Sequence, residues 1–248
     1  VNLAKAAERF GKGDYVNDFR PSGAAEIRQA GFEFDRMRKR IIRHLNQRSE
    51  MLSGISHDLR TPLTRMKLQM SLIKDPNIAK KLSEDVDEME KMLNEYLQFA
   101  SIGAKEKTEK FEINEFINSI ISKYDNSTIS FNSDKDIDFE GRKNLIKRCI
   151  SNLIDNSLKY GKKINISTEK IKKNLLIFIE DDGPGIPESE YENVFKPFYK
   201  IDKSRAEGKS SVGLGLSISS DIVRSHGGNI KLGSSKMGGL RVIISLPL

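Results

Sequence analysis

The residues best suited to chemistry near the N-terminus form one short run, Ile55-Ser56-His57-Asp58-Leu59-Arg60-Thr61-Pro62-Leu63. A neutral imidazole attacks phosphorus when one ring nitrogen is unprotonated and an acceptor such as Asp58 holds the other. Thr61 lies four residues after His57, so a helix brings the three polar side chains to one patch. With Leu52 and Leu59 taken as buried positions, this patch faces solvent. The run predicts a phosphoryl-accepting histidine, although an exposed histidine on a helix is by itself more often only a surface residue.

A second run, Asn152-Leu153-Ile154-Asp155-Asn156-Ser157-Leu158-Lys159-Tyr160, has the residue types of a nucleotide and metal site. Asn152 and Asn156 are four residues apart and lie on one face of a predicted helix. An asparagine oxygen ligates Mg²⁺ without adding charge, and Lys159 is placed to meet phosphate. Taken alone, two asparagines on a helix are better explained as a solvated face.

Two glycine-rich segments point to the same ligand. Asp181-Asp182-Gly183-Pro184-Gly185 carries a strand into a glycine turn with a carboxylate at its mouth, which can accept from an exocyclic amine. Gly213-Leu214-Gly215-Leu216 opens a predicted helix, where free backbone N–H groups favour phosphate. A strand-ending turn explains the first segment equally well. The second is neither a dinucleotide fingerprint nor a P-loop.

The first hundred residues position the histidine, and their apolar spacing is typical of helices that associate. Residues 3–10 form a short amphipathic segment, and a connector of Gly, Asp and Pro reaches Ser22. From about Ala24 a coiled-coil helix begins, and beyond Ile41 its repeat changes phase. The later repeat places Leu45, Leu52, Leu59, Met66 and Ile73 seven residues apart, with Ile55, Leu63 and Met70 widening the stripe. Asp75-Pro76-Asn77 turns the chain into a second helix, and two such hairpins pairing as a four-helix bundle predict a homodimer.

The last 140 residues or so mix short strands and helices after a polar linker at 101–110. We expect helices near 113–124, 142–160 and 214–226, and strands near 129–131, 137–139, 164–168, 175–180, 229–232 and 241–246. The change from almost continuous helix to mixed short elements predicts a multidomain chain, and the irregular alternation of strands and helices predicts a two-layer sandwich rather than a doubly wound sheet. An all-α coiled-coil and four-helix-bundle dimerisation region precedes an α/β two-layer sandwich.

The overall composition permits anionic partners without identifying one. Lys and Arg exceed Asp and Glu by 42 to 35, mostly as a solvated surface, although the basic run at 36–43 could face lipid headgroups. No nucleic-acid-binding pattern is present. Cys149 is expected in the core, whereas His44 and His226 are interpreted as surface histidines. The single cysteine and the absence of a long apolar stretch or signal peptide predict a soluble piece in a reducing compartment.

In their order and spacing, these segments resemble the sensor histidine kinases of two-component systems over the whole chain. The matching segments are 57–62 for the phosphoacceptor motif, 152–156 for the N box, 181–185 and 213–216 for the two glycine boxes, and Phe195-Lys196-Pro197-Phe198 for the F box. Residues 57–65 look especially like the EnvZ-like subgroup. The resemblance implies a HAMP-like signalling coiled coil at 1–45, a dimerisation and histidine phosphotransfer hairpin at 46–103, and a catalytic ATP-binding domain at 104–248.

The resemblance also implies a Bergerat-type site for ATP and Mg²⁺. Asn156 would hold the metal, Asp181 would read adenine, and a lid at about 200–211 would close over the phosphates. The implied nucleotide-binding residues are Asn152, Asn156, Lys159, Tyr160, Asp181, Gly183, Gly185, Lys203, Arg205, Gly213, Leu214, Gly215 and Leu216. One departure from the family pattern is Ser211, which stands where the second glycine box usually begins with glycine.

For the phosphoacceptor patch the resemblance implies two activities. Asp58 would polarise His57 for attack on the γ-phosphate, and Thr61 would position water when the same protein dephosphorylates its response regulator. The implied partners are a second copy and the receiver domain of that regulator. The implied location is the cytoplasmic portion of a bacterial inner-membrane protein whose sensor and membrane spans precede Val1.

Two other classes of function remain open at this point. An ATP-driven conformational clamp of the same superfamily would share the N and glycine boxes, but it would not need the patch of His57, Asp58 and Thr61. A non-catalytic coiled-coil adaptor would need the helices alone.

Overall fold

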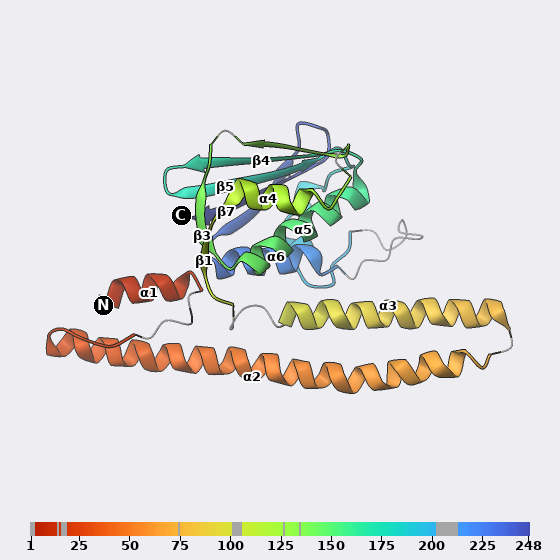
Figure 1. The fold of residues 1–248 in the computed structure, drawn as a ribbon, viewed down its shortest axis with the longest axis horizontal. Helices are drawn as coiled ribbons and strands as arrows, with labels where there is room; N and C mark the ends of the chain where they lie inside the picture. Colours follow the sequence, from red (N-terminus) through yellow and green to blue (C-terminus); the bar gives the residue numbers. More distant parts are fainter. Residues whose placement is uncertain are drawn as a thin grey trace.

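The structure, a computed structural model, describes residues 3–13, 15, 19–73, 75–100, 106–125, 127–133, 135–201 and 213–248, leaving out the side chains of residues 48, 53, 56, 57 and 95–100. Three helices come first: α1 (Leu3–Gly11), α2 (Ala25–Met70) and α3 (Pro76–Ala100). They lie along one side of the α/β domain that follows (Figure 1). Among the described residues, no helix has the length and hydropathy needed to cross a bilayer.

The N-terminal segment packs against α2 through aromatic rings and a close backbone approach. Phe34 of α2 meets the rings of Phe10 and Phe19 edge-on, with centroids 6.0 and 5.5 Å apart. A Cβ on Gly31 would lie 2.9 Å from the Pro21 side chain, so the chain after α1 folds back directly onto α2. In the basic run, Arg36 pairs with Glu33 at 3.1 Å, and Arg38 and Lys39 pair with Asp35 at 3.1 and 2.7 Å.

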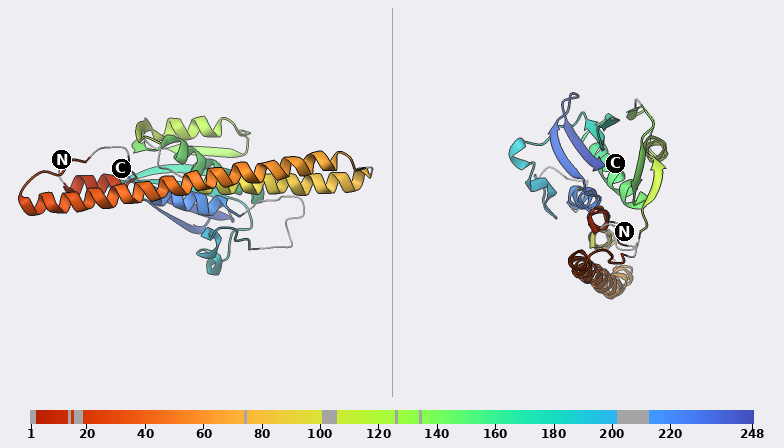
Figure 2. Two further views of the ribbon diagram at one scale, coloured as in Figure 1. Left: turned by 90° about the horizontal axis from the view of Figure 1, so that it is seen from below. Right: turned by 90° about the vertical axis from the view of Figure 1, so that its left-hand side faces the viewer.

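Helices α2 and α3 form the expected hairpin and lie side by side (Figure 2). Asp75 caps the N-terminus of α3, because its Oδ1 accepts from the N–H groups of Asn77 at 2.9 Å and Ile78 at 3.3 Å. Pro76 occupies the first helical position, where its missing N–H costs nothing.

The hairpin buries only part of the apolar stripe that the sequence predicted on α2. Leu63 and Met70 pack with Val86 of α3, and all three are buried. Leu59 and Met66 belong to the seven-residue repeat, yet they are 46% and 40% exposed. The assumption that Leu59 is buried was therefore wrong for the single chain, because α3 covers only the neighbouring face of α2.

In its described residues the C-terminal domain has two β-sheets and three α-helices. Its strands are β1 (Glu109–Glu112), β2 (Ile129–Ser133), β3 (Asp138–Gly141), β4 (Ile164–Ile171), β5 (Asn174–Asp181), β6 (Asn229–Ser234) and β7 (Leu240–Pro247). The main sheet has the order β2-β4-β5-β7-β6, with β2 parallel to β4 and the other neighbours antiparallel. A separate antiparallel ladder joins β1 to β3.

Helices α4 (Ile113–Ile121), α5 (Lys143–Tyr160) and α6 (Gly215–Ser225) cover one face of this sheet (Figure 1). Alternate residues of β7 point into the core, which gives the period of a sheet buried on one side. Helix α5 contributes Ile146, Cys149, Ile150 and Leu153 at helical spacing, and each is at most 2% exposed. The expected two-layer α/β sandwich is confirmed.

Three local expectations differ from the structure. Glu109 and Lys110 begin strand β1, although they were assigned to the linker. Two short 3₁₀ helices, η1 (Glu188–Glu190) and η2 (Asn193–Phe195), occupy part of the stretch expected to be without helices or strands. His226 was interpreted as a surface residue and is only 4% exposed, because its ring packs at the end of α6 beside Phe139.

Candidate functional site

The carboxylate of Asp181 is the centre of the candidate nucleotide site. Asp181 ends β5 and is 3% exposed. Its Oδ1 accepts from the backbone N–H groups of Gly183 and Leu240, each at 3.0 Å. Its Oδ2 accepts from the hydroxyl of Ser157 on α5 at 3.2 Å. Because the two backbone donors engage Oδ1, Oδ2 is the oxygen with the greater remaining capacity to accept from a ligand amine.

The turn after Asp181 leaves little space for side chains. A Cβ on Gly183 would lie 3.0 Å from Asp181 Oδ1 and 3.0 Å from the backbone oxygen of Tyr160. Gly185 has φ +70°, which favours glycine, as the sequence suggested. The neighbouring Asp182 has a structural role, because its Oδ1 accepts from the N–H groups of Lys162 and Lys163 at 2.6 and 2.9 Å. These backbone donors hold the pKa of the Asp182 carboxyl below its usual value.

The asparagine pair lies on α5 beside this turn, with both residues partly buried. Asn152 Nδ2 is buried and has no hydrogen-bond partner among the described residues. A buried polar atom without a partner is destabilising, so this amide is available for a hydrogen bond to a ligand. Nearby, the ammonium of Lys159 lies 5.1 Å from the ring centroid of Tyr160, whose side chain is 54% exposed.

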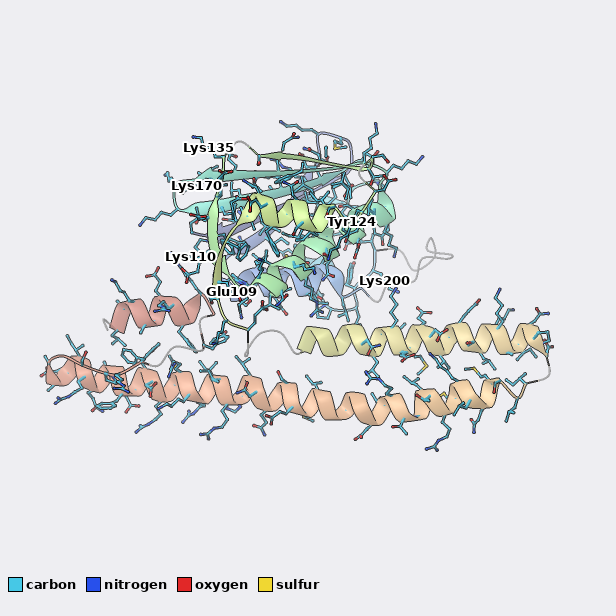
Figure 3. The ribbon with its side chains drawn as sticks, in the orientation of Figure 1. Glu109, Lys110, Tyr124, Lys135, Lys170 and Lys200 are labelled. Atoms are coloured by element: carbon cyan, nitrogen blue, oxygen red, sulfur yellow. The ribbon has the colours of Figure 1, made fainter. Side chains whose placement is uncertain are left out.

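Helix α5 is fixed on its outer side by Tyr124, which follows α4 and is labelled in Figure 3. The Tyr124 hydroxyl donates to Asp155 Oδ1 at 2.9 Å. Burial and then the Asp155 carboxylate raise the pKa of Tyr124 to about 12. The Asp155 carboxylate thus has a hydrogen-bond donor from the end of α4.

The second glycine box connects the F box to the start of α6. Gly213 has φ +79°, and its oxygen accepts from the Phe198 N–H at 3.0 Å. A Cβ on Gly213 would lie 2.9 Å from the backbone oxygen of Tyr199. Both the positive φ and this close approach therefore favour glycine here. Leu214 is fully buried and Leu216 packs against the core, whereas Gly215 begins α6 with open space around it. The N-terminus of α6 can thus approach phosphate closely.

The expected lid falls largely outside the described part of the chain. Lys203 and Arg205, the candidate phosphate contacts, and Ser211, the departure from the glycine pattern, lie outside the described residues. Lys200 is described, exposed and labelled in Figure 3.

The phosphoacceptor patch lies on the continuous helix α2, with Pro62 inside that helix. Asp58 and Thr61 are exposed, as expected, while the side chain of His57 lies outside the described part. A shallow hollow beside them on α2 is lined by Arg60, Thr61, Thr64, Arg65 and Leu68. The Arg60 guanidinium donates across the hairpin to Asn94 Oδ1 on α3 at 3.3 Å.

Three contributors to the Asp181 site were not predicted from the sequence. Ser157 lies within the asparagine run, but nothing in that spacing showed that its hydroxyl faces Asp181. Gly239 and Leu240 come at the end of the turn between β6 and β7. The Gly239 N–H donates to the backbone carbonyl oxygen of Asp181 at 3.2 Å. A Cβ on Gly239 would overlap the Asp181 carboxylate. The Gly238-Gly239 pair was the available signal.

Comparison with known protein families gives two matches, one over the phosphoacceptor hairpin and one over the nucleotide site. Residues 47–105 match the His Kinase A (phospho-acceptor) domain. Residues 141–248 match the family of histidine kinase-, DNA gyrase B-, and HSP90-like ATPases. The first match contains His57, and the second contains Asp181 and the asparagine pair.

Comparison with individual proteins agrees with the two family matches. The sensor histidine kinase GtrS of Pseudomonas aeruginosa is 35% identical over 247 residues, which is 99% of this chain and 51% of GtrS. The sensor histidine kinase CpxA of Escherichia coli is 28% identical over 92% of this chain and 53% of CpxA. The chain thus spans about half the length of these relatives.

Among solved structures, the fold is similar to that of full-length ShkA in complex with AMPPNP. The TM-score is 0.64 at 20% identity, over 80% of this chain and 45% of ShkA. With its phosphoacceptor hairpin and its ATPase domain in this order, the chain belongs to the sensor histidine kinases of two-component systems.

Proposed function

We propose that this chain is the kinase region of a sensor that uses ATP and Mg²⁺ to phosphorylate His57 and then transfers the phosphoryl group to an aspartate of a response regulator. The observation that carries the proposal is the Asp181 carboxylate, buried and held by donors from three segments, in the same chain as the exposed Asp58 and Thr61 beside His57. A conformational clamp would need only the first of these sites.

The proposed reaction breaks the bond between the γ-phosphorus and the oxygen of the ADP leaving group. A ring nitrogen of His57 supplies the electron pair, and the proton on the other ring nitrogen stays there, stabilised by the carboxylate of Asp58. Adenine is read by Asp181 Oδ2, and the N-terminus of α6 faces the phosphates. Most of the rate enhancement comes from positioning and charge neutralisation.

The residues present fit a magnesium ion that is held mainly by the nucleotide. Asn156 offers a neutral amide oxygen on the same face as the unpartnered Asn152 amide. The described residues contain no cluster of acidic or other metal-binding side chains large enough for a cage. Mg²⁺ usually retains several waters and binds through phosphates, and here it would neutralise phosphate charge. We propose Asn156 as its protein ligand.

We further propose that the active form is a homodimer. Each hairpin leaves a row of apolar side chains uncovered: Ile55 39%, Leu59 46%, Met66 40%, Ile78 52%, Leu82 40% and Met89 50% exposed. Leu59 and Met66 are seven residues apart, which is the spacing of a helix seam. A second copy is the partner that matches this stripe along its full length, giving a four-helix bundle.

The wider setting follows the relatives' names and the N-terminal pattern. We propose that residues 1–45 act as a HAMP-like signalling coiled coil, 46–103 as the phosphotransfer hairpin and 104–248 as the catalytic domain. We also propose that this piece faces the cytoplasm within a longer bacterial inner-membrane sensor. The assignment to an EnvZ-like subgroup stays a prediction.

The test is incubation of the full chain with γ-labelled ATP and Mg²⁺. We expect an acid-labile, alkali-stable label that is lost in His57→Gln and retained in His44→Gln, the matched change at an exposed histidine of the same helix. Acid-stable label, or equal labelling of both variants, would contradict the proposal.

A further inference from the structure

At the end of the ATP-binding domain away from the glycine boxes, the buried Arg142 and His226 lie beside the partly buried Ser225 and the exposed Gly227. Arg142 precedes α5 and is 1% exposed. Its Nη2 donates to the oxygen of Ser225 at 2.6 Å and to its hydroxyl at 2.7 Å. The N–H of Arg142 donates to His226 Nε2 at 3.1 Å, and His226 Nδ1 lies 2.8 Å from the Ile222 oxygen. We call this set the junction surface.

The chain that leaves α1 lies directly on the junction surface. Gly13 is buried with φ +83°, and a Cβ there would lie 2.6 Å from Arg142 Nη2 and closer still to the Ser225 oxygen. The Arg142 guanidinium lies 5.9 Å from the ring centroid of Tyr15, a cation–π distance. A Cβ on Gly227 would touch the Lys12 side chain at 3.6 Å. The approach at Gly13 is therefore too close for any residue with a side chain.

Aromatic contacts continue from this docked segment to α2. The ring of Tyr15 meets Phe10 of α1 edge-on at 5.2 Å, and Phe10 meets Phe34 of α2 at 6.0 Å. Figures 1 and 2 show α1 lying between α2 and the ATP-binding domain. The aromatic contacts thus form a continuous path from Phe34 of α2 through Phe10 and Tyr15 to Arg142.

The junction surface joins the two helices that carry the nucleotide residues. Helix α5 begins after Arg142 and continues to Asn152 and Asn156, while α6 begins at the second glycine box and ends at Ser225. The linker from the hairpin arrives at the same place, because Glu106 Oε1 accepts from the Asn144 N–H at 2.6 Å. Input from α1 and the covalent link to the phosphoacceptor hairpin therefore meet at the start of α5.

The buried position of Arg142 carries a cost that undocking would relieve. Burial lowers the pKa of the Arg142 guanidinium, with the Tyr15 hydroxyl and Glu106 acting in the opposite direction. Keeping a charged group in a buried position carries a desolvation cost that is relieved when water returns. Undocking of Gly13 and Tyr15 would return water to Arg142 and offset part of the lost contact. A contact of this kind can have two populated states.

We propose that the junction surface is the docking site for the chain's own segment around Gly13 and Tyr15, and that docking restrains the ATP-binding domain and slows phosphorylation of His57. The restraint rests on the proposed kinase function, whereas the docking does not. A domain held at this edge samples fewer orientations in which a bound γ-phosphate meets the histidine. Release of the segment by α1 frees the domain.

The test compares Gly13→Ala with Gly11→Ala in the full chain. The two changes are alike and two residues apart, but a Cβ on Gly11 meets nothing within 4 Å and its φ is not positive. We expect faster amide exchange over residues 142–146 and 225–228 in Gly13→Ala and not in Gly11→Ala, measured without nucleotide. Tyr15→Leu removes the aromatic ring that Arg142 contacts but creates no clash with the backbone. It should therefore show the same change to a smaller extent.

The second measurement is the initial rate of His57 labelling at saturating ATP. We expect Gly13→Ala to raise it about fivefold at unchanged ATP affinity, which corresponds to a docking free energy of about 1 kcal/mol. Equal exchange in the two glycine variants would overturn the docking. Faster exchange with an unchanged labelling rate would overturn the restraint. If no variant is labelled at all while exchange rises in Gly13→Ala, the docking stands and the kinase proposal fails.

Discussion

The hydroxyl of Ser157 lies 3.2 Å from Oδ2 of Asp181, and the two residues are 2% and 3% exposed. Because two backbone N–H groups already engage Oδ1 of Asp181, the serine is the side chain that orients the second oxygen. That oxygen is the one proposed to accept from the adenine amine. If Asp181 reads adenine as proposed, Ser157 acts as a positioning residue for that recognition.

Replacing Ser157 by alanine should weaken ATP binding about tenfold, because loss of one hydrogen bond to a charged acceptor costs on the order of 1.5 kcal/mol. Titration calorimetry on the purified chain measures the change. Ser122→Ala is the control, since the Ser122 hydroxyl only donates to the Ser119 oxygen at the end of α4. Equal affinities of the two variants would remove Ser157 from this role.

Replacing Asp181 by asparagine should invert the base preference while keeping the fold. The amide oxygen can still accept from the N–H groups of Gly183 and Leu240, but the amide nitrogen then faces the ligand and donates. We expect ATP affinity to fall about a hundredfold, roughly 2.7 kcal/mol, and inosine triphosphate, whose 6-oxo group accepts, to bind better than ATP. A variant that still prefers ATP would show that Asp181 does not read the 6-amino group.

His226 should make the domain less stable in mild acid. Burial first, and then the charge of Arg142, lower the pKa of His226 to about 4. Between the unfolded value near 6.5 and this folded value, the unfolded chain binds the extra proton, so stability is intact above pH ~6.5 and falls toward pH ~4. The full effect is about 3 kcal/mol.

His226→Gln should remove this part of the pH dependence, because glutamine does not titrate and retains a donor and an acceptor. Urea unfolding of the two proteins at pH 7 and pH 4.5 measures the difference, and carboxylates that titrate in the same range affect both proteins alike. Parallel stability profiles would mean that His226 is protonated in the folded domain as readily as in the unfolded chain.

The thiol of Cys149 should be inert until the core opens. It is 1% exposed between α5 and α6, and burial raises its pKa to about 12. A thiol reagent at pH 8 should leave the folded protein unmodified and react fully after unfolding. Rapid stoichiometric reaction of the folded chain would show that α5 and α6 separate readily.

Thr61 should separate the two activities proposed for the phosphoacceptor patch. Thr61→Ala should label at a near-normal rate but dephosphorylate the response regulator about tenfold more slowly, a barrier change of about 1.4 kcal/mol. Thr64→Ala is the matched control, because the Thr64 hydroxyl donates to the Arg60 oxygen at 3.0 Å on the same helix. An unchanged rate of dephosphorylation in Thr61→Ala would mean that another residue positions the attacking water.

The sequence by itself determined the elements whose signals are local. Apolar spacing located α2, α3, α5 and most strands, and Asp75-Pro76 marked the start of α3, because helix periodicity and capping depend on residues a few positions apart. The glycine turn after Asp181 was also predicted, because few residues other than glycine adopt the positive φ that Gly185 has there.

Only the tertiary structure decided which distant groups meet. Leu240 donates to Asp181 across 59 residues, and Ser157 reaches the same carboxylate across 24, through the pairing of β5 with β7 and the packing of α5 on the sheet. Burial of His226 and exposure of Leu59 depend likewise on which neighbour covers each face. Spacing along the chain shows which residues share a face, but the partner of that face is fixed only when the elements pack.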